Sequence, residues 1–149
     1  MFVELEHRIE QAVEKQMAEK NILVKNIQAN LMLDMAKIAS WEYDPETNLF
    51  NFDDIFYRLY EIDIHREGVY VASPEEFISD FVHPNDRQKV VDWIQKGSEM
   101  VDPNEYIQIE HRIINGDGRV KWVAVRVGAL FGPNGRPVKY CGVSQDITD

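Results

Sequence analysis

Few residues of this chain have the types and the spacing that catalysis requires. The 149 residues include four histidines and one cysteine, Cys141, which is followed by Gly142 in a segment that reads as a strand. A strand offers no helix N-terminus to lower the pKa of a thiol and activate it. The glycines follow neither the GxGxxG nor the GxxxxGK[ST] spacing of nucleotide-binding loops. We therefore predict that the chain is not an enzyme and contains no catalytic residue.

Metal ligands are equally sparse. A single cysteine excludes an internal disulfide bond and a CxxC-type metal site. Acidic residues are abundant between Glu42 and Asp80, but they do not follow the DxDxDG spacing of a calcium loop. We expect no metal site, and we interpret the acidic stretch as a solvated face.

One histidine, His111, stands in an unusual position. Residues 105–127 form two alternating apolar and polar runs joined by Asn115-Gly116-Asp117-Gly118, which predicts a β-hairpin. Because side chains alternate between the two faces of a strand, His111 shares its face with three isoleucines. A histidine on such a face either contacts a bound ligand or forms hydrogen bonds within a filled core. Both alternatives remain open at this point.

The composition describes one ordinary domain with an appendage. Apolar residues make up 44% and charged residues 28% of the chain. No apolar run approaches the roughly 20 residues needed to cross a bilayer, and the N-terminus lacks the basic-then-apolar plan of a secretory signal. With a single cysteine, the chain is expected in the reducing cytoplasm. The net charge of −10 repels a polyanion, so we expect no nucleic-acid partner.

The first predicted unit is residues 1–38, which contain no proline or glycine and read as one long amphipathic helix from residue 2 onward. If Val3 starts a heptad repeat, Ile38 falls on an equivalent position, but so does Glu10. Such a helix cannot bury its apolar stripe alone. We expect it to form a homodimer along much of its length, to contact the domain towards Ile38, and to act as a dimerisation helix and linker.

The second predicted unit is residues 39–149, in which short strands and short helices follow one another. Asp53 or Asp54, the capping box Ser73-Pro74-Glu75-Glu76, and His83-Pro84 are each predicted to open a helix. Strands are expected over 40–44, 49–52, the two arms of the hairpin and 137–146, with an irregular stretch over 61–72. This order predicts an α+β fold: an antiparallel five-stranded sheet with the helices gathered on one face.

Several motifs of the second unit occur in a familiar order. They are Trp41-Glu42-Tyr43-Asp44, His83-Pro84-Asn85-Asp86-Arg87, Glu110-His111-Arg112-Ile113, Asp117-Gly118-Arg119, Lys121-Trp122-Val123 and Gly142-Val143-Ser144-Gln145-Asp146-Ile147-Thr148. With these motifs, residues 39–148 resemble a PAS domain of the bacterial signalling subtype that carries a histidine-proline motif. The resemblance implies a sensor or interaction module, usually part of a histidine kinase or a diguanylate cyclase. Its closing Asp-Ile-Thr normally leads to the output domain, so the chain looks like an excised module.

The resemblance also bears on cofactors. Light-sensing relatives carry a cysteine in an Asn-Cys-Arg-Phe motif, where this chain has Asn85-Asp86-Arg87-Gln88. They also place a glutamine near the end of the last strand, where this chain has Ser144. A flavin is therefore not expected. The His83-Pro84 pair suggests a haem ligand, but a histidine beside a proline at a helix start is more often a structural cap, so haem is not expected either. The identity of any cofactor stays open.

Ligands of the family bind between the sheet and the helices, so the resemblance implies a pocket there. The candidate pocket residues are His111, Tyr43, Trp41, Phe56, Tyr60, Phe81, Ile109, Val125, Tyr140 and Ser144. Apolar walls with a few polar tips suit a small molecule. A carboxylate or another hydrogen-bonding small molecule suits His111 and Tyr43. The alternative is a filled core, which would make the chain a ligand-free PAS module for dimerisation and spacing.

The opposite face of the hairpin has an architectural pattern. Arg112 and Arg126 can pair with neighbouring strands beside Trp122, and the surface offers a place for the N-terminal helix. Exposed pairs add little stability. We therefore expect Arg112 and Trp122, with Asp146 and Thr148 of the closing motif, to relay strand shifts to an output domain outside the chain.

Overall fold

The computed structural model describes residues 2–62 and 71–148. The chain divides into two compact units, residues 1–36 and residues 37–149. Most of the stretch predicted to be irregular, 61–72, lies outside the described residues. No helix within the described residues is long and apolar enough to cross a membrane.

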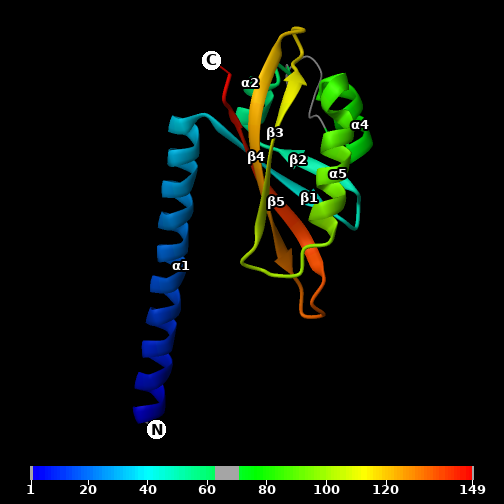
Figure 1. Ribbon diagram of the computed structural model, residues 1–149. Helices are drawn as coiled ribbons and strands as arrows, with labels where there is room; N and C mark the ends of the chain where they lie inside the picture. Colours follow the sequence, from blue (N-terminus) through cyan, green and yellow to red (C-terminus); the bar gives the residue numbers. More distant parts are fainter. Residues whose placement is uncertain (1, 63–70, 149) are drawn as a thin grey trace. The chain divides into compact units, whose positions relative to one another are not determined.

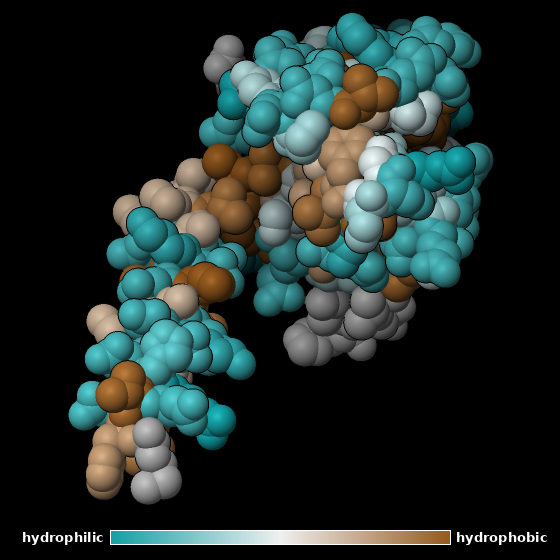
Figure 2. Space-filling view, turned by 90° about the horizontal axis from the view of Figure 1, so that it is seen from below, coloured by the Kyte–Doolittle hydropathy of each residue, from teal (hydrophilic) through white to brown (hydrophobic). Residues whose placement is uncertain are grey.

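The first unit is the helix α1, Phe2–Ala36, with 35 residues and none of them buried. The predicted helix ran two residues further, to Ile38, which instead begins a strand. The reason is the backbone of Lys37, whose φ of 56° is left-handed and ends the helix. Apolar side chains remain on the surface of α1 between hydrophilic ones (Figure 2).

The second unit is built on a five-stranded antiparallel sheet with the strand order β2-β1-β5-β4-β3. The strands are β1 Ile38–Asp44, β2 Leu49–Phe52, β3 Tyr106–Ile114, β4 Val120–Phe131 and β5 Pro137–Asp146. Since β1 and β5 are central neighbours, the start and the end of the unit lie side by side in the sheet (Figure 1). The predicted α+β fold is confirmed.

Within the described residues, three α-helices lie on one face of the sheet (Figure 1): α2 Asp54–Leu59, α4 Pro74–Phe81 and α5 Arg87–Ser98. Asp53 caps α2 by accepting a hydrogen bond from the amide of Phe56, and Ser73 caps α4 in the same way through the amide of Glu76. A short 3₁₀ helix, η1 Pro84–Asp86, precedes α5, and Nδ1 of His83 accepts from the amide of Asn85 at 3.1 Å. His83 therefore has the structural capping role that its position beside proline predicts.

The hairpin has the predicted two faces. In β3 the residues at alternate positions are buried, His111 among them at 3% exposure, and His111 lies opposite Val123 of β4. The apolar stripe of α5 differs in one residue from its prediction, because Val90 is buried whereas Val91 is 44% exposed. The helix therefore faces the sheet through Val90 and the residues one turn further on.

An aromatic cluster fills much of the space between the sheet and the helices. Phe56 stacks on Phe52 with ring centroids 3.8 Å apart and on Tyr60 at 4.1 Å. Phe77 and Phe81 of α4 extend the cluster, with centroids 5.7 Å and 5.2 Å from Tyr60. These rings join β2, α2 and α4 into one core and leave the remaining space next to α5.

Candidate ligand-binding site

A small cavity remains between the sheet and the helices, and we call it the inner cavity. Its volume is about 40 Å³. Among the described residues, its walls come from all five strands and from α2, α4 and α5: Trp41, Phe50, Phe52, Phe56, Tyr60, Phe77, Val90, Trp93, Ile94, His111, Val125 and Ser144. Most of these side chains are apolar, and the polar groups among them belong to aromatic rings, His111 and Ser144.

A second hollow adjoins the inner cavity, and we call it the recess. It has a volume of about 150 Å³ and is more open than the inner cavity. The two share Trp41, Phe50, Trp93 and Ile94, while Tyr43, Pro74, Gly97, Ser98, Ile107, Val127 and Tyr140 line the recess alone. The inner cavity and the recess are therefore adjacent hollows with a shared wall, and we treat them together as one candidate site, with His111 in the inner cavity and the two tyrosines in the recess.

Trp41 is held across the middle of the sheet. It pairs with Gly142 of β5, and the missing side chain at position 142 leaves space for the indole. Its Nε1 donates to Oγ of Ser144 at 3.0 Å, and Ser144 is in turn hydrogen-bonded to Tyr60. Burial raises the pKa of Tyr60, so its phenol stays protonated. This network joins β1, β5 and α2 at the wall of the inner cavity.

His111 lies at the deep end. Its Nδ1 is 3.2 Å from the carbonyl oxygen of Arg112, which only accepts hydrogen bonds, so Nδ1 carries the hydrogen. Burial lowers the pKa of His111, although this bond to Arg112 and the charge of Asp86 oppose the effect. The ring is therefore neutral at pH 7, and its Nε2 has a free lone pair.

The guanidinium of Arg112 connects the helices to the outer face of the sheet. It binds Asp86 through Nη2 at 2.7 Å and Nε at 3.1 Å, and its backbone amide donates to the same carboxylate at 2.6 Å. These bonds hold the pKa of Asp86 at about 2, despite the opposing effect of burial. The guanidinium also lies 5.4 Å from the centroid of Trp122, a cation–π distance.

Trp122 continues the connection to the C-terminal motif. Its backbone amide donates to Oγ1 of Thr148 at 2.8 Å, and its carbonyl accepts from the amide of Ile147 at 2.9 Å. The amide of Thr148 donates to Asp146 at 2.9 Å. Contacts thus run from His111 through Arg112 and Trp122 to Thr148.

Comparison with known proteins identifies the family. Residues 69–144, just over half of the chain, match the family model described as the PAS fold. The chain belongs to the PAS family. The comparison of this PAS chain with curated protein sequences returned no match.

Solved structures are similar to this PAS chain, and three of them come from bacteria. A sensory box histidine kinase/response regulator from Burkholderia thailandensis is 21% identical, with a TM-score of 0.66, over 82% of this chain and 86% of that one. The N-terminal domain of a diguanylate cyclase with PAS/PAC sensor from Marinobacter aquaeolei is 21% identical, with a TM-score of 0.63, over 74% and 95% of the two chains. A PAS domain from Colwellia psychrerythraea is 19% identical, with a TM-score of 0.61, over 85% and 98%. Such likeness establishes the PAS fold.

The structure brings most of the candidate pocket residues of this PAS domain together. Trp41, Phe56, Tyr60, His111, Val125 and Ser144 line the inner cavity, and Tyr43 and Tyr140 line the recess. Phe81 and Ile109 lie in the buried core and not among the lining residues.

Sequence reasoning missed the wall that α5 contributes. Trp93 and Ile94 line both hollows and Val90 lines the inner cavity, although their spacing identified them only as an apolar stripe. The signal was present in that stripe, because a helix packed on the PAS sheet must turn such residues towards the ligand space. Phe50 and Phe52 of β2 were missed as well, although they share the face of Trp41 and Tyr43 by strand pairing.

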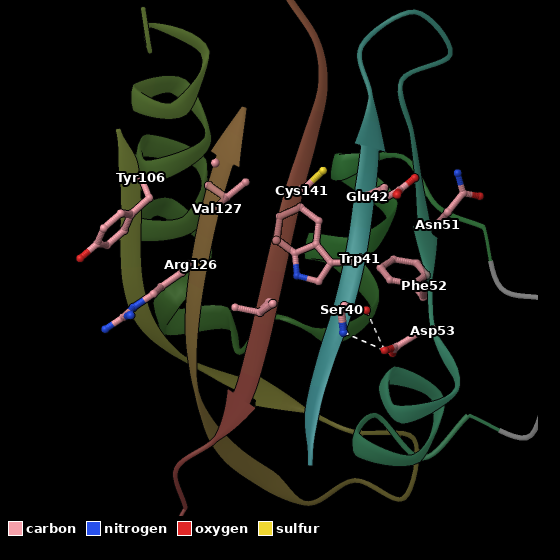
Figure 3. Close-up of a pocket in the computed structure, with 13 residues that line it drawn as sticks. Ser40, Trp41, Glu42, Asn51, Phe52, Asp53, Tyr106, Arg126, Val127 and Cys141 are labelled. Atoms are coloured by element: carbon pink, nitrogen blue, oxygen red, sulfur yellow. Dashed lines mark hydrogen bonds between the residues drawn. The ribbon is translucent and has the colours of Figure 1, made fainter. Parts of the chain in front are cut away.

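The outer face of the PAS sheet carries a broad groove with a volume of about 510 Å³ (Figure 3). Glu42, Asn51 and Arg126 lie along it, and Cys141 of β5 is at its centre. Some of its polar groups bond to one another, as Ser40 does to Asp53 at 2.9 Å. The groove is wide and open, so it lacks the enclosure that a small-molecule site needs.

Proposed function

We propose that this chain is the sensory module of a bacterial signal-transduction protein and binds a small molecule in the inner cavity and the recess. The observation that carries the proposal is an apolar hollow between sheet and helices with a neutral His111 at its deep end. Such a hollow with few polar groups is what a small-molecule site requires. The output domain would be a fused histidine kinase or diguanylate cyclase, the two kinds of protein to which the PAS chain is similar.

The contacts around His111 supply a route for the signal. A ligand that contacts His111 would shift β3, and the bond of its ring to the Arg112 carbonyl would pass the shift to Arg112. From there the guanidinium meets Trp122, whose amide holds Thr148 of the closing motif. The ligand must bind the two states of this network unequally, because only differential affinity moves an equilibrium.

We further propose that α1 pairs with the α1 of a second copy. Phe2, Val13, Val24 and Met35 recur every 11 residues and so fall on one side of a helix, since 11 residues make about three turns. Leu5, Ile9, Ile27 and Leu31 flank them at spacings of three and four residues, and Lys20 interrupts the stripe. All of these apolar side chains are 49–85% exposed. A homodimer would cover the stripe that a single helix leaves in water.

Three further expectations stay with the proposal: a cytoplasmic location, no catalysis by the chain itself, and no nucleic-acid partner. The alternative function, a ligand-free PAS module for dimerisation and spacing, keeps the α1 pair and removes the ligand. The volume of the inner cavity, about 40 Å³, is compatible with this alternative as well as with a small ligand.

A ligand screen with two matched variants separates these functions. Val90→Phe fills the inner cavity from α5, whereas Val91→Phe adds the same ring to the exposed side of the same helix. We expect compounds that raise the melting temperature of the wild type and of Val91→Phe, but not of Val90→Phe, with isothermal titration giving the affinities. A fragment screen without a hit would overturn the sensor function and leave the spacer function.

A further inference from the structure

The chemical character of the lining residues limits the ligand. Of the described residues that line the inner cavity and the recess, none is charged. The guanidinium of Arg112, the residue next to His111, is engaged by Asp86 through two side-chain bonds. An ionised ligand would lose its hydration in these hollows without an opposite charge to replace it. The site therefore disfavours a carboxylate, one of the ligand classes that the sequence suggested.

Trp93 supplies an unused hydrogen-bond donor. Its Nε1 is buried and, among residues 2–62 and 71–148, has no hydrogen-bond partner. The indole lines both the inner cavity and the recess. A buried indole N–H normally finds an acceptor, because leaving it unpaired costs free energy. The other indole of the site, Trp41, has its acceptor in Ser144. Trp93 is thus the donor that a ligand oxygen can satisfy.

His111 supplies the complementary acceptor. Because Nδ1 carries the hydrogen in its bond to the Arg112 carbonyl, Nε2 of the neutral ring can only accept. His111 and Trp93 line the same cavity of about 40 Å³, so one small ligand can reach both rings. The site offers one donor and one acceptor within apolar walls.

The volumes set the size of the ligand. The recess measures about 150 Å³. A cavity of about 150 Å³ holds benzene, whereas sites for drug-sized ligands measure roughly 300–1,000 Å³. A single ring with one small polar substituent therefore fits the recess and extends its polar end into the inner cavity.

We propose that the site takes a neutral, single-ring ligand with an acceptor beside a donor, such as a carboxamide or an oxo-substituted nitrogen heterocycle. The acceptor takes the hydrogen of Trp93 Nε1, and the donor binds Nε2 of His111. This inference rests on the proposed sensor function, and it names the class of ligand and the residue, Trp93, that selects it.

The test compares four probes on the full chain at pH 7 by isothermal titration: benzamide, 2-pyridone, benzoate and toluene. Benzamide and benzoate share a shape and differ in charge, and toluene lacks polar groups. We expect benzamide or 2-pyridone to bind at least about tenfold tighter than benzoate and toluene, since a lost hydrogen bond to a buried donor has about this effect. Tighter or equal binding of benzoate or toluene would overturn the inference and leave the sensor function intact. If none of the four binds, the inference fails, and the fragment screen decides the sensor function separately.

Variants test the two rings. Trp93→Phe removes the donor and keeps an aromatic ring, and we expect about tenfold weaker binding of the neutral probe with little change for toluene. Val91→Phe on the same helix is the control. His111→Phe removes the acceptor and should weaken the neutral probe by a similar factor, so that the inference remains testable if one variant does not fold. Unchanged affinity for the neutral probe in a folded Trp93→Phe or His111→Phe variant would show that the ring does not hold the ligand.

Discussion

The indole of Trp41 occupies the space that a side chain at position 142 would need. The two residues are paired across β1 and β5, and a Cβ on Gly142 would overlap the six-membered ring of the indole. The same indole donates to Ser144, which lies two residues further along β5. A glycine in the middle of a strand thus lets an aromatic ring reach across the sheet into the wall of the ligand site.

Gly142→Ala should therefore destabilise the protein. Overpacking of this kind costs about 1–3 kcal/mol in the free energy of unfolding, because the indole or the strand must move. Urea titration measures the change. Gly128→Ala is the matched control, since it also lies in a central strand and its Cβ would be 3.9 Å from the nearest atom, the carbonyl oxygen of Glu105. Equal stability of the two variants would mean that Trp41 has room to move aside.

Asp86 should stabilise the fold in a manner that depends on pH. Its pKa is lowered from 3.8 to about 2, mainly by the side-chain bonds to Arg112. Because the folded pKa is the lower one, the stabilisation is present above about pH 4 and is lost as the pH falls through 2. Asp86→Asn should reduce the free energy of unfolding by about 1.5 kcal/mol at pH 7 and by less near pH 2.

Urea titrations of the wild type and of Asp86→Asn at several pH values test this. Glu42→Gln is the control, because its pair with Lys139 at 3.0 Å joins two side chains that are 51% and 41% exposed. If wild type and Asp86→Asn differed in their free energy of unfolding by the same amount at pH 7 and near pH 2, the ionised carboxylate would not have this role.

The same substitution tests the proposed relay. If Arg112 transmits through Trp122 to the C-terminal motif, Asp86→Asn should speed hydrogen exchange at the amides of Trp122 and Ile147, which are bonded to Thr148 and to the Trp122 carbonyl. A loss of about 1.4 kcal/mol in local stability corresponds to about tenfold faster exchange. If exchange at these two amides matched the wild type and became faster only in η1, the route from Arg112 through Trp122 to the C-terminal motif would be excluded.

His111 should make stability fall in mild acid. Its pKa is lowered from 6.5 by burial, with Asp86 and Lys89 as the charged groups nearby. The unfolded chain then takes up a proton below about pH 6.5 that the folded chain resists, so stability is complete above 6.5 and declines below it. His111→Phe should remove this decline between pH 7.5 and 5.5, measured by urea titration.

The fold should survive the His111→Phe substitution, since a phenyl ring suits the apolar face of β3. A ligand of the inner cavity should bind more weakly to this variant. His7→Gln on the exposed α1 is the control for the loss of a histidine. If the free energy of unfolding of His111→Phe still declines between pH 7.5 and 5.5, another group causes the acid sensitivity.

The α1 pair has its own test. Ile27 belongs to the exposed apolar stripe, and its neighbour Asn26 projects from another side of the helix. We expect the wild type to be a dimer by light scattering and Ile27→Glu to be a monomer at the same concentration, whereas Asn26→Glu stays dimeric. Circular dichroism checks that the helix remains formed. A wild type that is monomeric at high micromolar concentration would refute the homodimer.

Local sequence signals determined much of this protein. The alternation of apolar and polar residues in 105–127 predicted both faces of the hairpin, because successive side chains of a strand point to opposite faces of the sheet. The pair Asp53 and Asp54 predicted the start of α2 and Ser73 that of α4, since a helix leaves its first amides unpaired and a short polar side chain satisfies them. Only the structure shows that Asp53 is the cap of α2. The left-handed backbone at Lys37, which ends α1 two residues early, has no comparable local signal.

The tertiary structure alone decided how distant residues meet. Trp41 and Ser144 are 103 residues apart and share a hydrogen bond only because β5 returns to pair with β1. The volume of the inner cavity depends on how much of the space between sheet and helices the stacked rings of Phe52, Phe56 and Tyr60 fill. The spacing of residues in a sequence does not determine that volume. The unpartnered Nε1 of Trp93 is likewise a fact of three dimensions, because an acceptor can come from any part of the chain.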